Sequence, residues 1–240
     1  GISPLAARTE AQRDALQHAL NTIAPDKFHV QLGLKHAHPM IEESVNDLAQ
    51  QGFTTIIALV LAPHYSSYSI GQYVGRASDA ALPHGINVIG IDSWATEPAF
   101  IRFIANDMEQ KRSNMPARTR ALFTAHSLPQ RIIDGGDPYP QELHATATAV
   151  AKQLNMNEGD DWGIAWQSAG RTPEPWIGPD ILAVLQEISD TKSADGVVVS
   201  ACGFVADHLE VLYDLDIEAQ HLADKLGLAF ARTACVNDDS

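Results

Sequence analysis

Apolar residues recur along this chain in two alternating rhythms. From residue 6 to residue 23 they fall every three or four positions, which is the 3.6-residue period of an amphipathic helix. Residues 54–61 are β-branched or apolar throughout, as expected of a strand that is buried on both faces of a parallel sheet. The same alternation continues along the chain and predicts an α/β fold. The predicted helices span residues 6–23, 40–51, 69–82, 98–111, 140–155, 179–188 and 204–226, and the predicted strands span 28–34, 54–61, 87–91, 120–124, 162–166 and 196–200.

The rhythm of helices and strands restarts near residues 92–97, which divides the pattern into two halves. We therefore expect two domains, residues 1–92 and residues 93–240. Each is predicted to be a Rossmann-like domain with a parallel sheet, and the two are expected to enclose an interdomain cleft. Ligands of open α/β sheets bind beyond the carboxyl ends of the strands, so the cleft is the expected position of a site.

Charge and composition narrow the classes of partner. The chain has 16 Lys and Arg against 30 Asp and Glu, a formal net charge of −14, which disfavours nucleic acid as a partner. The longest uninterrupted apolar run, residues 56–62, is too short to cross a bilayer, so no integral membrane segment is expected. Two cysteines, Cys202 and Cys235, cannot form a disulfide framework. These features are typical of a cytoplasmic protein.

Polar residues follow several predicted strands at the point where each strand ends. Turn formation explains any one of these clusters by itself. His126 stands out because it comes directly after an apolar strand, where a cleft is expected to open, although a single histidine of this kind is more often structural than catalytic. The clusters are residues 63–69, 126–129, 167–170 and 201–204.

The segment 204–218 carries a row of acids. On a helical wheel Asp207, Glu210, Asp214 and Glu218 fall within one arc, which is most often a solvated face of an amphipathic helix. Carboxylates four residues apart repel one another, however, and the segment contains no Lys or Arg. A hydrated divalent metal ion that passes along the row is the alternative explanation.

Several common site motifs are missing from the sequence. There is no H-E-x-x-H and no C-x-x-C, which argues against a zinc site. Neither of the glycine-rich phosphate-binding patterns occurs, so no nucleotide cofactor is expected.

Five stretches of the chain, in the same order, resemble the ferrochelatases, enzymes that insert Fe²⁺ into a porphyrin. They are residues 1–5 (GISPL), 61–66 (LAPHYS), 125–129 (AHSLP), 136–140 (GDPYP) and 203–210 (GFVADHLE). Residues 166–180 resemble the branch of the family that uses coproporphyrin III. The resemblance implies the class II chelatase-like form of the two-domain fold, a porphyrin and Fe²⁺ as substrates, and transient contact with other enzymes of the haem pathway.

The resemblance also assigns roles to residues. It implies that His126 and Glu210 face each other across the porphyrin as the catalytic metal-insertion pair. Asp214 and Glu218 match acidic positions on the same helix, so His126, Glu210, Asp214 and Glu218 are the expected metal-contacting residues, and this helix can include a π-bulge in the family.

Ser3 and Tyr73 match positions that contact substrate propionates or the ring edge. The family pattern begins further upstream, with a first strand and with a tyrosine and arginines around the porphyrin, so we expect this sequence to lack an N-terminal segment. The four cysteines of cluster-bearing relatives are not matched, and no iron–sulfur cluster is expected.

Alternatives remain open at this point. His126 can act as a base or as a metal ligand. The substrate can be protoporphyrin IX instead of coproporphyrin III, the enzyme can be a cobalt chelatase of the same fold, or the chain can be a non-catalytic haem- or metal-binding module. This chain can also be an inactive fragment.

Overall fold

The computed structural model describes residues 3–239, so Gly1 and Ile2 of the opening motif and the terminal Ser240 lie outside the described residues. The chain divides into two compact units. The N-terminal unit consists of Leu5–Trp94 and the segment that begins at Asn237, and the C-terminal unit consists of Ala95–Val236 and the segment that ends at Pro4. The two-domain division at residues 92 and 93, and the cleft between the domains, stay predictions.

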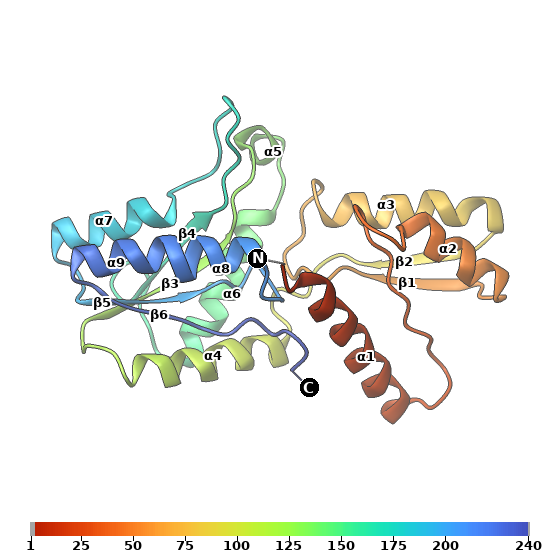
Figure 1. Ribbon diagram of the computed structural model, residues 1–240, viewed down its shortest axis with the longest axis horizontal. Helices are drawn as coiled ribbons and strands as arrows, with labels where there is room; N and C mark the ends of the chain where they lie inside the picture. Colours follow the sequence, from red (N-terminus) through yellow and green to blue (C-terminus); the bar gives the residue numbers. More distant parts are fainter. Residues whose placement is uncertain (1–2, 240) are drawn as a thin grey trace. The chain divides into compact units, whose positions relative to one another are not determined.

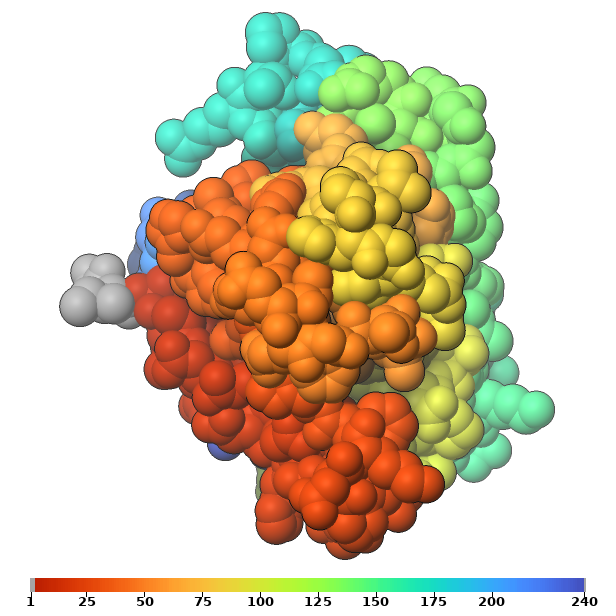
Figure 2. Space-filling model, turned by 90° about the vertical axis from the view of Figure 1, so that its right-hand side faces the viewer, coloured from red at the N-terminus to blue at the C-terminus, as the bar shows by residue number. Residues whose placement is uncertain are grey.

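The N-terminal unit pairs two parallel strands with three helices. Its elements are α1 (Leu5–Ile23), α2 (Ile41–Gln50), β1 (Thr55–Leu59), α3 (Ile70–Ala81), the short 3-10 helix Leu82–His84 and β2 (Asn87–Ile91). Helices α2 and α3 lie side by side, as the orange and yellow surfaces of Figure 2 show. A small core closes between them and the sheet, made of Ile41, Val45, Ala77, Ala81 and Ile86.

The strand predicted at residues 28–34 is absent, and this prediction is wrong. The segment forms no ladder; only Leu34 makes an isolated bridge, to Met40. The backbone N–H of Val30 donates to Oε1 of Gln17 at 2.7 Å, and the N–H of Leu34 donates to the carbonyl of Pro39 at 2.8 Å. Alternating apolar residues make a strand only where a neighbouring strand offers hydrogen bonds, and here a helix side chain and a local turn supply them instead.

The C-terminal unit contains a four-stranded parallel sheet in the order β4-β3-β5-β6. Helices α4 and α6 cover one face, and α7, α8 and α9 cover the other (Figure 1). The elements are α4 (Pro98–Arg112), β3 (Thr119–His126), α5 (Gln130–Asp134), α6 (Tyr139–Gln153), β4 (Trp162–Gln167), α7 (Ile181–Thr191), β5 (Gly196–Ser200), α8 (Leu209–Tyr213), the π-helix η2 (Asp214–Ala219), α9 (Gln220–Leu226) and β6 (Ala229–Arg232).

The alternation predicted from the sequence is confirmed, since both units are mixed α/β layers with parallel strands. Burial agrees with the pattern in the C-terminal unit, where every residue of β5 is buried. Among the described residues, no helix is both long enough and apolar enough to span a membrane.

The helix predicted at residues 204–226 begins later and is not uniform. Residues 201–208 form turns, and α8 begins after His208, whose Nδ1 accepts the backbone N–H of Val211 at 3.3 Å. The π-helix η2 follows directly, as the family resemblance had implied. A histidine cap and a wider π-turn leave the apolar periodicity of the sequence nearly unchanged, so the sequence pattern does not record them.

Candidate active site

Two neighbouring strand ends and one helix build the candidate site within the C-terminal unit. His126 is the last residue of β3 and pairs in register with Gln167, the last residue of β4. Glu210 lies in α8, and its Oε2 is 3.5 Å from Nε2 of His126. Both side chains are partly exposed, at 35% for His126 and 51% for Glu210. The fold therefore brings together the two residues that the sequence singled out.

The predicted placement of this pair across the porphyrin does not fit the distance. Carbon atoms in contact are about 3.5–4.0 Å apart, so a ring between two side chains needs roughly twice that space. His126 and Glu210 are too close for a macrocycle to lie between them. In this structure the two side chains are therefore direct neighbours, with no space for a ring between them.

The ring of His126 is oriented by its own neighbour in sequence. Its Nδ1 lies 2.5 Å from the carbonyl oxygen of Ser127, which can only accept, so Nδ1 carries a proton and donates it. In the neutral ring Nε2 is then the acceptor, and it faces Glu210. Ser127 is itself held firmly, because its N–H donates to the carbonyl of Gln167 and its hydroxyl donates to the carbonyl of Ile177, both at 2.7 Å.

Two acceptor atoms therefore face each other at 3.5 Å, the lone pair on Nε2 of His126 and a carboxylate oxygen of Glu210. Neither satisfies the other unless a proton or a cation lies between them. The arrangement can take up a proton, hold an incoming divalent cation, or exchange one for the other.

Close packing of a glycine brings the start of the α8 segment to the end of β3. A Cβ built on Gly203 would lie 2.4 Å from Cβ of Ala125, which no side chain tolerates. The N–H of Gly203 donates to the carbonyl of Thr124 at 3.0 Å. Only glycine allows this turn to cross so near the strand that ends in His126.

The other acids of the predicted row have separate partners. Oδ2 of Asp214 accepts a short hydrogen bond from the hydroxyl of Ser168, and Oδ1 of Asp207 lies 3.2 Å from Nη1 of Arg232. Glu218 is exposed. Within residues 3–239 no three His, Cys, Asp or Glu side chains gather as a metal site, so His126, Glu210, Asp214 and Glu218 are not assembled into one cluster.

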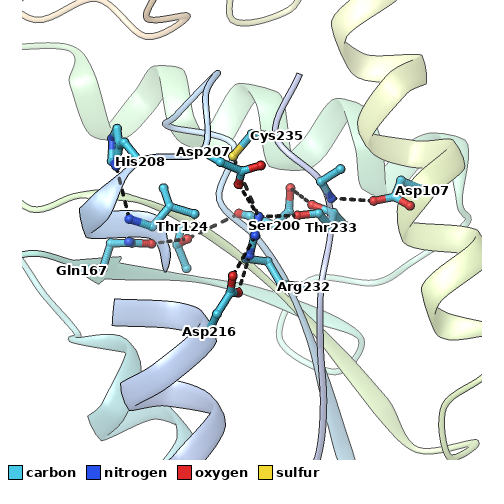
Figure 3. A network of polar contacts seen from close by, with 12 residues as sticks. Asp107, Thr124, Gln167, Ser200, Asp207, His208, Asp216, Arg232, Thr233 and Cys235 are labelled. Atoms are coloured by element: carbon cyan, nitrogen blue, oxygen red, sulfur yellow. Dashed lines mark hydrogen bonds and ion pairs between the residues drawn. The ribbon is translucent and has the colours of Figure 1, made fainter. Parts of the chain in front are cut away.

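Part of the acid row lies in the π-helix η2, which contains Asp214 and Glu218 and has i to i+5 backbone hydrogen bonds. The missing cation comes from elsewhere in the chain. Arg232 at the end of β6 contacts both Asp207 and Asp216, as Figure 3 shows. The sequence pattern does not reveal this arginine because no strand is predicted there, although the short apolar run of residues 226–231 offered a weak signal for one.

Two sequence-predicted residues remain, Ser3 and Tyr73, and each is described within its own unit. Ser3 is exposed, in the short segment that belongs to the C-terminal unit. Tyr73 is in α3 of the N-terminal unit, where Nζ of Lys35 lies 5.5 Å from the centre of its ring, and burial raises the pKa of its hydroxyl. Their roles toward a substrate stay predictions.

Burial determines the protonation state of the two cysteines and of one further histidine. It raises the pKa of Cys202 and of Cys235 to about 12, so both thiols stay protonated at neutral pH. It lowers the pKa of His64, which follows β1, to about 3 and keeps that imidazole neutral. Beside His126, the buried amide of Gln167 accepts from the hydroxyl of Thr124 at 2.8 Å, while its Nε2 has no partner among the described residues.

The α/β fold is of the chelatase-like class. The structure of SirB from Bacillus subtilis with Fe³⁺ superimposes with a TM-score of 0.61, covering 96% of this chain and 84% of SirB at 14% identity, which is a likeness of fold. The sequence then identifies the family. The ferrochelatase family model matches residues 1–240, and the chain belongs to the ferrochelatase family of metal-inserting enzymes.

Curated relatives agree with this assignment. The coproporphyrin III ferrochelatase of Anoxybacillus flavithermus is 41% identical over 99% of this chain and 76% of its own length. Coproporphyrin III ferrochelatase 1 of Bacillus cereus is 42% identical over 99% of this chain and 77% of its own length. The ferrochelatase of Herpetosiphon aurantiacus is 42% identical over the whole of this chain and 79% of its own length. The family resemblance seen in the motifs is confirmed.

Proposed function

We propose that this ferrochelatase inserts Fe²⁺ into coproporphyrin III, with His126 and Glu210 as the pair that exchanges protons for metal. The single observation that carries the proposal is the pair of facing acceptor atoms, 3.5 Å apart at the open end of β3. The names of the relatives at 41–42% identity support iron insertion and this porphyrin.

The reaction sets a definite proton balance. A free-base porphyrin carries two N–H groups, and both protons leave as the divalent metal binds the four ring nitrogens. The iron stays Fe²⁺, so no oxidant or reductant is needed. A base that works near neutral pH is required, and a neutral imidazole meets that need.

His126 is suited to accept these protons. Its Nδ1–H donates a hydrogen bond to the Ser127 carbonyl, so the lone pair that can accept a proton is on Nε2. The carboxylate of Glu210 stabilises the imidazolium that forms, and it also attracts the entering cation. The partial exposure of both groups leaves a route by which each proton passes on to water.

The test is an anaerobic absorbance assay of metal insertion with the full chain, Fe²⁺ and coproporphyrin III. His126→Ala should lower kcat by about 10²–10⁴-fold, the range typical of a lost general base, while porphyrin still binds. Glu210→Gln should also lower kcat, because its neutral amide does not stabilise the positive charge.

A matched pair in the same unit provides the control. His144 and Glu158 form a similar histidine–carboxylate contact, 2.9 Å between Nε2 and Oε1, on the surface. His144→Ala should leave kcat unchanged. Normal turnover in His126→Ala would contradict the assigned role of that residue, and a wild-type chain that binds haem without accelerating its formation would be a binding module instead.

The choice of porphyrin is tested in the same assay. Coproporphyrin III should be metalated faster than protoporphyrin IX at equal concentration. The reverse order would contradict the proposed substrate while leaving iron insertion intact, and faster insertion of Co²⁺ than of Fe²⁺ would contradict the proposed metal.

A further inference from the structure

Arg232 joins two acids that flank Glu210 in sequence. Its Nε and Nη2 contact the two carboxylate oxygens of Asp216 at 2.6 and 2.9 Å, a bidentate pair. Its Nη1 lies 3.2 Å from Oδ1 of Asp207 and donates to the carbonyl of Thr233 at 3.0 Å. Figure 3 shows the guanidinium between the two acids, with Asp207 on one side and Asp216 on the other.

These contacts tie the Glu210 segment to the sheet at both of its ends. Asp207 lies in the turn before α8, and Asp216 lies in the π-helix that follows it. Arg232 is the last residue of β6, the edge strand that pairs with the fully buried β5. One side chain on the sheet therefore holds the segment that places Glu210 near His126.

The geometry requires an arginine rather than a positive charge alone. The Arg232 side chain is only 14% exposed, so its charge needs close partners, and the planar fork satisfies two carboxylates at once. A lysine ammonium is a point charge that cannot hold the bidentate contact with Asp216 and reach Asp207 in the same way.

We propose that Arg232 is a positioning residue for metal insertion: it acts through Asp207 and Asp216 to keep Glu210 within reach of His126. This inference rests on the proposed function, since it assigns Arg232 a part in the same site. Among the described residues, Arg232 forms no hydrogen bond or ion pair with His126 or Glu210, so its influence is on geometry and not on the chemical step directly.

The chain offers a matched control in a second bidentate arginine. Nε and Nη2 of Arg118 contact the two oxygens of Asp195 at 2.8 and 2.5 Å, and its Nη1 donates to a backbone carbonyl. This pair is exposed and joins the start of β3 to the start of β5, at the end of the sheet opposite to His126. Replacing Arg118 therefore measures the effect of losing a bidentate arginine far from the site, and replacing Arg232 measures the effect of losing the one beside it.

The experiment compares Arg232→Gln, Arg232→Lys and Arg118→Gln in the anaerobic assay, with kcat and KM measured for Fe²⁺ and for coproporphyrin III. Arg232→Gln should lower kcat by about 10²-fold, as a misplaced catalytic group does, with the porphyrin KM unchanged. Arg232→Lys should recover part of this loss, and Arg118→Gln should match the wild type.

Hydrogen exchange of the α8 and π-helix amides provides a readout that does not depend on turnover. Exchange should be faster in Arg232→Gln and unchanged in Arg118→Gln. If Arg232→Gln does not fold, Asp216→Asn removes the bidentate contact while Arg232 keeps Asp207, and the same loss of kcat is expected.

Three different results would overturn the inference. Wild-type kcat in Arg232→Gln, or in Asp216→Asn where that variant is used, shows that the contacts of Arg232 with Asp207 and Asp216 do not position Glu210. The proposed function stands in that case. An equal loss in Arg118→Gln shows a general effect on stability. A wild-type chain without metal insertion overturns the proposed function, and the positioning role with it.

Discussion

The two parallel sheets of this protein are made from similar sequence patterns and have different surroundings. In the C-terminal unit, β5 is buried along its whole length between helices on both faces (Figure 1). In the N-terminal unit, β1 and β2 alternate between exposed and partly buried residues. Large aliphatic side chains on these two strands are exposed by 36–51%, namely Ile57, Leu59, Ile89 and Ile91.

The difference shows that an apolar run predicts a strand but not its burial. A parallel sheet is stabilised when both of its faces are covered, and a pair of strands by itself is marginal. The candidate site lies on the sheet that meets this condition. Its two strand ends and the α8 segment are therefore supported by a core that lies between the sheet and the helices α7, α8 and α9.

The largest expected effect comes from truncating one leucine in each sheet. Leu122 in β3 is 1% exposed, and Leu122→Ala should lower the free energy of unfolding of the C-terminal unit by about 2–5 kcal/mol. Leu59 in β1 is 37% exposed, and Leu59→Ala should cost the N-terminal unit less than about 1 kcal/mol. Urea unfolding followed by hydrogen exchange of peptides from each unit measures both, and equal losses would remove the contrast between the sheets.

Replacing one glycine by alanine should lower stability in the C-terminal unit and raise it in the N-terminal unit. Gly203→Ala forces the turn away from Ala125 and should destabilise the C-terminal unit by about 1–3 kcal/mol, with loss of kcat because the α8 segment moves. Gly75 in α3 has open space around it, so Gly75→Ala should stabilise the N-terminal unit by about 0.5–1 kcal/mol. Thermal unfolding of both variants tests the pair, and a stabilised Gly203→Ala would contradict the close approach.

Acid should weaken the N-terminal unit through His64. The pKa of this histidine is lowered by burial from 6.5 to about 3, so between these values the unfolded chain binds one more proton than the folded chain. The contribution of neutral His64 to the free energy of unfolding is therefore fully present above pH 6.5. It falls by up to about 1.4 kcal/mol per pH unit as the pH decreases toward 3.

Hydrogen exchange of β1 and β2 as a function of pH measures this loss. His64→Gln, which cannot be protonated, should flatten the dependence between pH 6.5 and 4.5. An equally steep dependence in His64→Gln would show that another group controls the acid response.

Much of the site could be predicted from the sequence because its signals are local. His126 directly follows an apolar strand, and Glu210 belongs to a family motif that the chain carries intact. The sequence shows that the segment with the acid row contains no Lys or Arg. The cation that pairs with Asp207 and Asp216 is Arg232, which comes from a strand that the sequence pattern did not reveal.

The sequence by itself determined the α/β alternation of both units, the family, and the two residues on which the proposed chemistry depends. Tertiary structure alone decided that residues 28–34 form no strand, that Asp207 pairs with Arg232 of a distant strand, and that Nε2 of His126 faces Glu210. The physical reason is the distance along the chain over which each signal acts. Periodicity records which face of a segment is buried, whereas hydrogen-bond partners and ion pairs depend on segments that are distant in the chain and meet only when it folds.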